Sequence, residues 1–166
     1  MPREAKWDQR FLDLAFEISS WSKESGRRVG AVVVGPDREI RATGYNGLPR
    51  GVDDARPERH SRRSGAKYLW SSHAERNAIY NAARVGTALK GCTIYVQMYP
   101  CHECAKAIIQ AGITCVVTAP PDLADPQWRE SFDISATMFA EAGVTVRKRP
   151  QARPLLRGDY AEPEPQ

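Results

Sequence analysis

Ser72-His73-Ala74-Glu75 and Pro100-Cys101-His102-Glu103-Cys104 are the two stretches that decide the fold predicted for this chain. Each follows a loop or a strand-like run and begins a predicted helix. The first helix is expected from about His73 to Val85, with Ser72 as its N-cap, and the second from Cys101 to about Ala111. A glycine follows each helix, which is a common stop signal. The chain is therefore expected to alternate helix and strand around these two helix starts.

Apolar runs on both sides of these helices complete the predicted architecture. Strands are expected at residues 30–34, 39–44, 93–97, 113–118 and 144–146, and amphipathic helices at residues 6–22 and 127–142. The first two strands should form a hairpin, whereas the helices between the later strands imply parallel pairing, with helices on the faces of the sheet. The sequence predicts one α/β domain over residues 1–149 and a proline-rich, flexible tail over residues 150–166.

Three side chains in the opening stretches are of the kind that zinc prefers: His73, Cys101 and Cys104. The two cysteines are three residues apart and share one helix face, so one metal ion can bridge two helices that pack side by side. Three protein ligands leave the fourth tetrahedral position for water, which is the arrangement of a catalytic zinc site. Glu75 lies two residues after the histidine and can take a proton from that water.

Other interpretations of the same residues explain less of the pattern. A redox pair of Cys101 and Cys104 leaves His73 and Glu75 without a role. A closed structural zinc site needs a fourth ligand, and His102 is expected to point away from both sulfurs. The combined pattern, H-x-E followed by P-C-x-x-C, is the signature of zinc deaminases that act on nucleobases.

The composition bounds the function without choosing it. The chain has 166 residues and a net charge of +4, which favours anionic ligands but does not separate a nucleotide from a polynucleotide. Cys92 and Cys115 lie in apolar runs and are expected to be buried thiols, so no disulfide framework is predicted. No run can cross a bilayer and no apolar signal core is seen at the start, so a cytoplasmic location is the default expectation.

Residues 45–71 form the longest predicted stretch without periodicity. The stretch is expected to be a loop, and loops of this length are usually functional or disordered. It carries a basic cluster whose members either contact phosphate or belong to a solvated surface: Arg50, Arg56, Arg59, Arg62, Arg63 and Lys67. His60 lies within the same segment and is not expected to be a metal ligand.

Several further stretches carry a resemblance to a known family. They are Val29–Val34, Gly44–Gly51 with Asp53-Asp54, Lys67-Tyr68, His73–Ile79 and Cys104–Ile113. Together with the zinc signature, they resemble the cytidine deaminase superfamily and, within it, the deoxycytidylate (dCMP) deaminases, over most of residues 7–148. The Gly44–Gly51 stretch discriminates best, since the tRNA adenosine deaminases of the superfamily usually lack it.

The resemblance implies a three-layer α/β/α cytidine-deaminase-like fold with a central five-stranded mixed sheet. It implies hydrolytic deamination at C4 of a cytosine ring, giving dUMP and ammonia from dCMP. Zn²⁺ would be the cofactor, held by His73, Cys101 and Cys104, with Glu75 as the proton shuttle. The resemblance also assigns substrate contacts, namely Ala74, Tyr99 and Pro100 to the base, Asn46 to the sugar, and Ser22 and Lys23 to the phosphate, with Arg27 or Arg28 as further candidates.

Assembly and regulation follow from the same resemblance. Many members of the family are homo-oligomers, hexamers or dimers, which dCTP activates and dTTP inhibits through the loop that holds Gly47 and Arg50 here. A small nucleotide is the expected partner, and neither nucleic acid nor a membrane is expected. Two other hypotheses remain open. The chain could deaminate another cytosine nucleotide or nucleoside, or a base in tRNA or single-stranded DNA, or it could be a zinc-containing nucleotide sensor without turnover, against which the presence of Glu75 argues.

Overall fold

A computed structural model describes residues 3–158 and has the predicted α/β architecture. The longer helices are α1 (Arg3–Ser19), α3 (Ala74–Val85), α4 (His102–Gln110) and α5 (Arg129–Glu141). The strands are β1 (Gly30–Val34), β2 (Ile40–Tyr45), β3 (Thr93–Val96), β4 (Cys115–Thr118) and β5 (Thr145–Lys148). Two short helices, η1 (Pro57–His60) and α2 (Ala66–Trp70), lie in the segment for which the sequence predicts an irregular loop.

The five strands form one mixed sheet in the order β2-β1-β3-β4-β5. Strand β1 pairs antiparallel with both β2 and β3, which confirms the predicted hairpin. Strands β3, β4 and β5 are parallel, as the helices between them require. The sheet therefore changes from antiparallel to parallel at β3, and α4 begins in the connection that leaves this strand.

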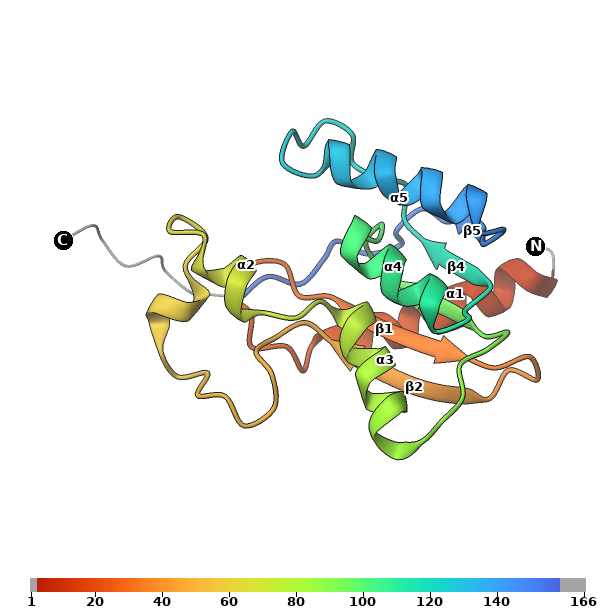
Figure 1. Cartoon of the computed structure of the whole chain (residues 1–166), viewed down its shortest axis with the longest axis horizontal. Helices are drawn as coiled ribbons and strands as arrows, with labels where there is room; N and C mark the ends of the chain where they lie inside the picture. The colour runs from red at the N-terminus through yellow and green to blue at the C-terminus, as the bar shows by residue number, and fades with distance from the viewer. Residues whose placement is uncertain (1–2, 159–166) are drawn as a thin grey trace.

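Helices cover both faces of the sheet and make three layers (Figure 1). Alternate residues of each central strand face opposite sides because the side-chain period of a strand is two. Val32, Val34 and Val117 pack with Phe11 and Ala15 of α1 on one face. The opposite face carries the larger core, formed with the buried sides of α3, α4 and α5: Ala31, Val33, Ala78, Ala82, Ile94, Val96, Ala105, Ile108, Val116 and Phe139. The predicted three-layer α/β/α fold is confirmed.

The first helix ends earlier than predicted. Its last residue is Ser19, not Ser22, and Trp21 is 61% exposed instead of contributing to the core. The Ser19 and Ser20 hydroxyls each donate to the carbonyl three residues earlier, that of Phe16 or Glu17, at 2.6 Å. Such bonds compete with helix continuation, which explains why the apolar period of the sequence runs past the helix end.

The first part of the predicted tail lies against the domain. The Arg28 amide donates to the Leu156 carbonyl at 2.8 Å, and the Gly158 amide donates to the Gly26 carbonyl at 3.1 Å. Residues 159–166 of the predicted tail lie outside the described residues, and the domain boundary at residue 149 stays a prediction. Within residues 3–158, no helix is both long and apolar enough to cross a membrane.

A buried ion cluster ties α1 to the far edge of the sheet. Asp8 is fully buried, and its carboxylate oxygens lie 2.8 Å from guanidinium nitrogens of Arg147 and Arg149. The Tyr95 hydroxyl donates to the same carboxylate at 3.3 Å. Because the two arginines would lose their shared counter-charge, the cluster should be sensitive to loss of Asp8.

We expect Asp8→Ala to lower the free energy of unfolding by about 3–5 kcal/mol, as for other buried ion pairs broken on one side. Urea denaturation followed by circular dichroism measures this change. Asp13→Ala is the matched control on the same helix, because Asp13 is partly exposed and its partner Arg153 lies 3.5 Å away at the surface. Equal losses in the two variants would contradict the structural role given to Asp8.

Candidate metal centre and active site

Two helix starts bring the candidate metal ligands together. His73 is the N-cap of α3 and Cys101 the N-cap of α4, both with extended backbone, so each side chain stands at a helix end. Ser72, predicted as the cap of α3, lies one residue too early and pairs instead with Gly47 through two backbone hydrogen bonds of 2.8 and 3.0 Å. This pairing fixes the loop after β2 beside the segment that carries His73.

Close packing of α3 on β2 sets the position of the first helix start. A Cβ atom on Gly44 would lie 2.3 Å from the Ala78 amide nitrogen and 2.5 Å from the Ala74 carbonyl oxygen. Only glycine allows this approach, because any side chain would collide with helix backbone. Gly44 therefore lets α3 pack closely on β2, and this packing helps to fix the position of His73 at the start of α3.

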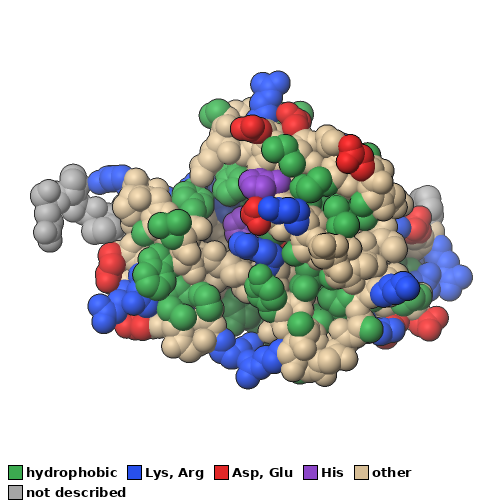
Figure 2. Space-filling view, viewed as in Figure 1, with side chains coloured by type: hydrophobic (Ala, Val, Ile, Leu, Met, Phe, Trp, Pro, Cys, Tyr) green, Lys and Arg blue, Asp and Glu red, His purple; other side chains and the backbone are tan. Residues whose placement is uncertain are grey.

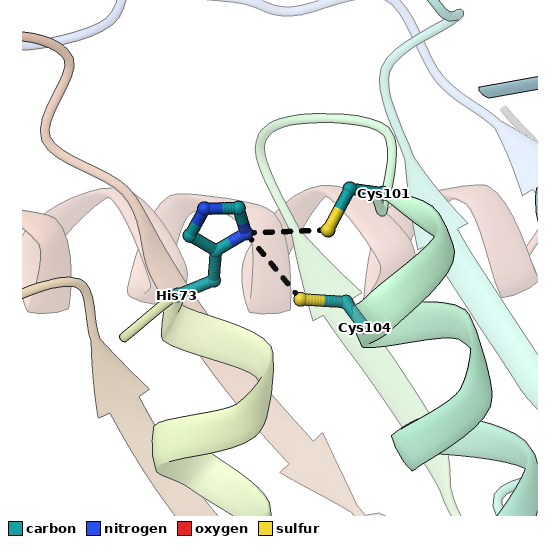
Figure 3. Close-up of side chains that lie close together, drawn as sticks. All are labelled: His73, Cys101 and Cys104. Atoms are coloured by element: carbon teal, nitrogen blue, oxygen red, sulfur yellow. Dashed lines mark hydrogen bonds between the residues drawn. The ribbon is translucent and has the colours of Figure 1, made fainter. Parts of the chain in front are cut away.

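The three candidate ligands converge on one point (Figure 3). The Nδ1 atom of His73 lies 3.4 Å from Cys101 Sγ and 3.5 Å from Cys104 Sγ. A tetrahedral zinc ion, with bonds of about 2.3 Å to sulfur and about 2.0–2.1 Å to nitrogen, separates each sulfur from the nitrogen by about 3.5 Å. The side chains are thus already spaced as zinc requires.

The electrostatics of the cluster favour a thiolate. A hydrogen bond from the Cys104 thiol, and a weaker effect of the hydrogen-bonded His73 ring, lower the pKa of the Cys101 thiol to about 3. Burial of Cys101 acts in the opposite direction, but it does not outweigh them. The same pairing and burial raise the pKa of Cys104. One sulfur is therefore already in the form that binds a cation, and the Cys104 thiol would have to lose its proton to bind zinc, because the thiolate is the binding form.

Glu75 lies beside the ligands in a cavity. Its side chain is buried, and this burial raises the pKa of the carboxyl group, while the nearby His73 opposes the rise. His73, Cys101 and Glu75 line the same cavity, together with Ala74 and Tyr99. Figure 2 shows histidine side chains near the centre of this face, with acidic, basic and hydrophobic side chains around them.

Aromatic side chains that the sequence did not single out as site residues form one wall of this cavity. Trp128, just before α5, stands edge-on to the His73 ring with 6.1 Å between centroids. Trp128 also stacks on Phe132 at 6.4 Å and meets Tyr68 of α2 edge-on at 6.0 Å. Trp128 and Phe132 belong to the amphipathic helix predicted at residues 127–142, and an amphipathic pattern carries no signal for a cavity wall.

The predicted sugar and phosphate contacts are only partly in the cavity. Asn46 lines it, and its side chain also holds backbone, since Oδ1 accepts from the Val29 amide at 2.8 Å and Nδ2 donates to the Arg27 carbonyl at 2.9 Å. Ser22 is buried and donates to the Asn46 carbonyl at 2.7 Å. The Lys23 side chain is 75% exposed and bonds Asp54 at 2.8 Å, outside the cavity.

Of the remaining residues predicted for the site, Pro100 lies beside the metal ligands, whereas Gly47 and Arg50 lie in a separate groove. Pro100 is buried directly before Cys101, whereas Gly47 and Arg50 line a second groove with Lys23. His102, the alternative fourth ligand, points to Ser131 instead, with Nδ1 2.8 Å from the hydroxyl oxygen. The buried His60 has its Nε2 atom 2.8 Å from the Asp54 carbonyl, and Cys92 and Cys115 are buried free thiols, as predicted.

Comparison with known proteins identifies the family of this site. Residues 5–119 match the model of the cytidine and deoxycytidylate deaminase zinc-binding region, which includes both helix starts. The chain belongs to the cytidine and deoxycytidylate deaminases. The metal of this deaminase is therefore zinc, for which His73, Cys101 and Cys104 are positioned.

Individual relatives of this deaminase agree with the family match. Human deoxycytidylate deaminase is 39% identical over 148 residues, covering 86% of this chain and 79% of the human protein. An uncharacterized deaminase of Aliivibrio fischeri is 41% identical over 144 residues, covering 86% of this chain and 92% of that protein. The dCMP deaminase of cyanophage S-TIM5, solved in complex with dCMP and dUMP, is 27% identical with a TM-score of 0.71, covering 90% of this chain and 99% of the phage protein.

Proposed function

We propose that this protein catalyses the hydrolytic deamination of dCMP to dUMP and ammonia. The observation that carries the proposal is the buried Glu75 carboxyl, which shares one cavity with His73 and Cys101 of the three-residue zinc site. The relatives named deoxycytidylate deaminase, and the phage enzyme solved with dCMP and dUMP, support the choice of nucleotide.

His73, Cys101 and Cys104 would hold the zinc, which when bound acts as a Lewis acid and lowers the pKa of a water molecule. Glu75 is the residue that moves protons. It would take one from the attacking water and give it to N3 of the cytosine ring as the C4–O bond forms. It would then move the proton of the new C4 hydroxyl to the departing amine as the C4 carbonyl forms. Loss of ammonia breaks the C4–N bond and leaves uracil. A carboxyl whose pKa burial raises suits this double role as acid and base.

Other residues of the cavity would bind and orient the nucleotide. The backbone of Ala74 and of Tyr99-Pro100 would meet the polar edge of the base, and Asn46 the sugar. The rings of Trp128 and Phe132 provide an apolar wall that excludes water from the reacting atoms. Ser22 holds the Asn46 carbonyl, so we propose that it supports the loop and does not touch the substrate.

Regulation, assembly and location belong to the same proposal. The groove lined by Gly47 and Arg50 is a candidate site for the regulatory nucleotides dCTP and dTTP. The exposed aromatic side chains along it, among them Trp21 and Tyr80, support a homo-oligomer, a hexamer or a dimer, that covers them. A cytoplasmic location is consistent with a role in nucleotide metabolism.

A substrate panel separates the proposed function from its alternatives. We expect ammonia release from dCMP with kcat/KM at least about 10²-fold above that for deoxycytidine, cytidine or a short cytosine-containing oligonucleotide, because a phosphate held by cationic groups contributes several charge-assisted hydrogen bonds. Coupled detection of ammonia measures each rate. Turnover of the oligonucleotide alone would transfer the proposal to polynucleotide editing, and binding of dCMP without turnover would favour a nucleotide sensor.

A further inference from the structure

A largely buried ion pair contributes its lysine to the wall of the zinc cavity. Glu24 is 1% exposed, and its Oε2 atom lies 3.0 Å from Nζ of Lys67, whose side chain is 12% exposed. The Ser71 hydroxyl donates to the other oxygen of Glu24. The carboxylate therefore connects the segment before β1 with α2 and with the residues directly before His73.

The geometry of this pair leaves the lysine able to bind a second anion. Lys67 Nζ lies 3.0 Å from Glu24 Oε2. An ammonium group has three N–H donors, so one such contact leaves donors for a second anion. Because a lysine is seldom buried without a counter-charge, Glu24 also offsets the desolvation cost of keeping Lys67 at this position.

Three cations line the zinc cavity, and the carboxylates that hold two of them do not. Lys67, Arg62 and Arg27 line the cavity with His73 and Glu75. Glu24 lines the second groove and not this cavity. Asp125 lies 3.6 Å from Arg27 and is not a lining residue of the cavity either. The cavity therefore presents a positive wall beside an aromatic one, a combination that suits a base with an attached phosphate.

We propose that Lys67, with Arg27 and Arg62, forms the subsite for the 5′-phosphate of the nucleotide, and that Glu24 is the positioning residue that holds Lys67 there. This inference rests on the proposed function. It replaces Lys23 as the phosphate contact, because Lys23 is mostly exposed, bonds Asp54 and lines a different groove. Glu24 does not touch the substrate in this account and acts through the lysine.

The test compares a nucleotide with the matching nucleoside. In Lys67→Met we expect kcat/KM for dCMP to fall about 10- to 100-fold, through KM, because one or two charge-assisted bonds to phosphate are lost. The kcat/KM for deoxycytidine, which has no phosphate, should be unchanged. Glu24→Gln should show the same loss for dCMP and the same indifference for deoxycytidine.

A double variant separates positioning from folding. Glu24→Gln alone leaves a buried lysine without its partner and can lower stability, whereas Glu24→Gln with Lys67→Met removes both charges. We expect the double variant to regain thermal stability and still to lack the preference for dCMP. Recovery of that preference together with stability would show that the pair is merely structural and would overturn the proposal.

Arg63→Met is the matched control, since Arg63 belongs to the same basic segment, is exposed and is not a lining residue of the cavity. It should keep the full preference for dCMP. Loss of the preference in Lys23→Met, with Lys67→Met unaffected, would refute the assignment and restore the contact predicted from the sequence.

Calorimetric binding of dUMP and deoxyuridine to the zinc-loaded protein tests the phosphate subsite without requiring turnover of dCMP. If the parent protein turns over neither dCMP nor deoxycytidine, the proposed function fails, and the binding data alone decide on the subsite. Weaker binding of dUMP by Lys67→Met, about 10-fold or more, with deoxyuridine unchanged, supports the subsite. Equal affinity of the parent and Lys67→Met for dUMP contradicts it.

Discussion

Replacement of Glu75 by glutamine should lower kcat for dCMP by about 10²–10⁴-fold, the usual contribution of a positioned acid–base group. Glutamine keeps the size of the side chain and one acceptor oxygen, but it cannot accept a proton from water or return it to N3. Since Glu75 is not among the three ligand residues, zinc content should stay at one ion per chain. Steady-state rates and metal analysis of the same sample measure the two properties together.

Glu103→Gln is the matched control for this experiment. Glu103 lies on α4 between the two ligand cysteines, but it is exposed and pairs with Lys106 at the surface. Its removal should leave kcat and zinc content unchanged. A Glu75→Gln protein that keeps the turnover of the parent, with zinc bound, would remove Glu75 from the proposed chemistry.

Loss of a zinc ligand should lower the turnover of dCMP about as much as loss of Glu75, because the protein then binds zinc more weakly. We expect Cys104→Ala to bind zinc at least about 100-fold more weakly than the parent, beyond the 10–100-fold that outer partners of metal ligands contribute. Turnover of dCMP should fall with zinc occupancy, and the protein should melt at a lower temperature, because metal binding contributes to folding free energy. Competition with a chromophoric chelator measures the affinity.

Cys115→Ala provides the comparison for this ligand variant. Cys115 is a buried thiol at the start of β4 and packs in the core on the α1 face of the sheet. Its replacement should cost stability by leaving a small cavity, but zinc affinity should stay at the parent value. If Cys104→Ala and Cys115→Ala retained zinc equally well, the triad would not be the metal site.

The sequence is most informative where local signals and metal chemistry agree. The spacing of Cys101 and Cys104 fixes one helix face, and glycines after both helices mark their ends, so the amino-acid sequence alone places the two helix starts. The parallel pairing of β3, β4 and β5 follows from the helices between them. These features depend on residues near one another in the chain.

Contacts between distant segments are the part that could not be predicted. Trp128 and Lys67 enter the zinc cavity from elements whose local patterns indicate a core helix and a loop. Lys23 lies in the connection between α1 and β1, and its side chain pairs with Asp54 at the surface. The direction of a side chain depends on tertiary packing. The periodic pattern of apolar residues in one sequence does not show that packing.

One zinc ion held by His73, Cys101 and Cys104, together with the carboxyl of Glu75, would convert dCMP to dUMP. Proton NMR of dCMP incubated with purified protein holding one zinc ion per chain tests it most directly, because the H5 and H6 signals of cytosine and uracil differ. We expect steady replacement of dCMP by dUMP with one ammonia per dUMP, and a rate about 10²–10⁴-fold lower with Glu75→Gln. A dCMP spectrum that stays unchanged with zinc fully bound would contradict it.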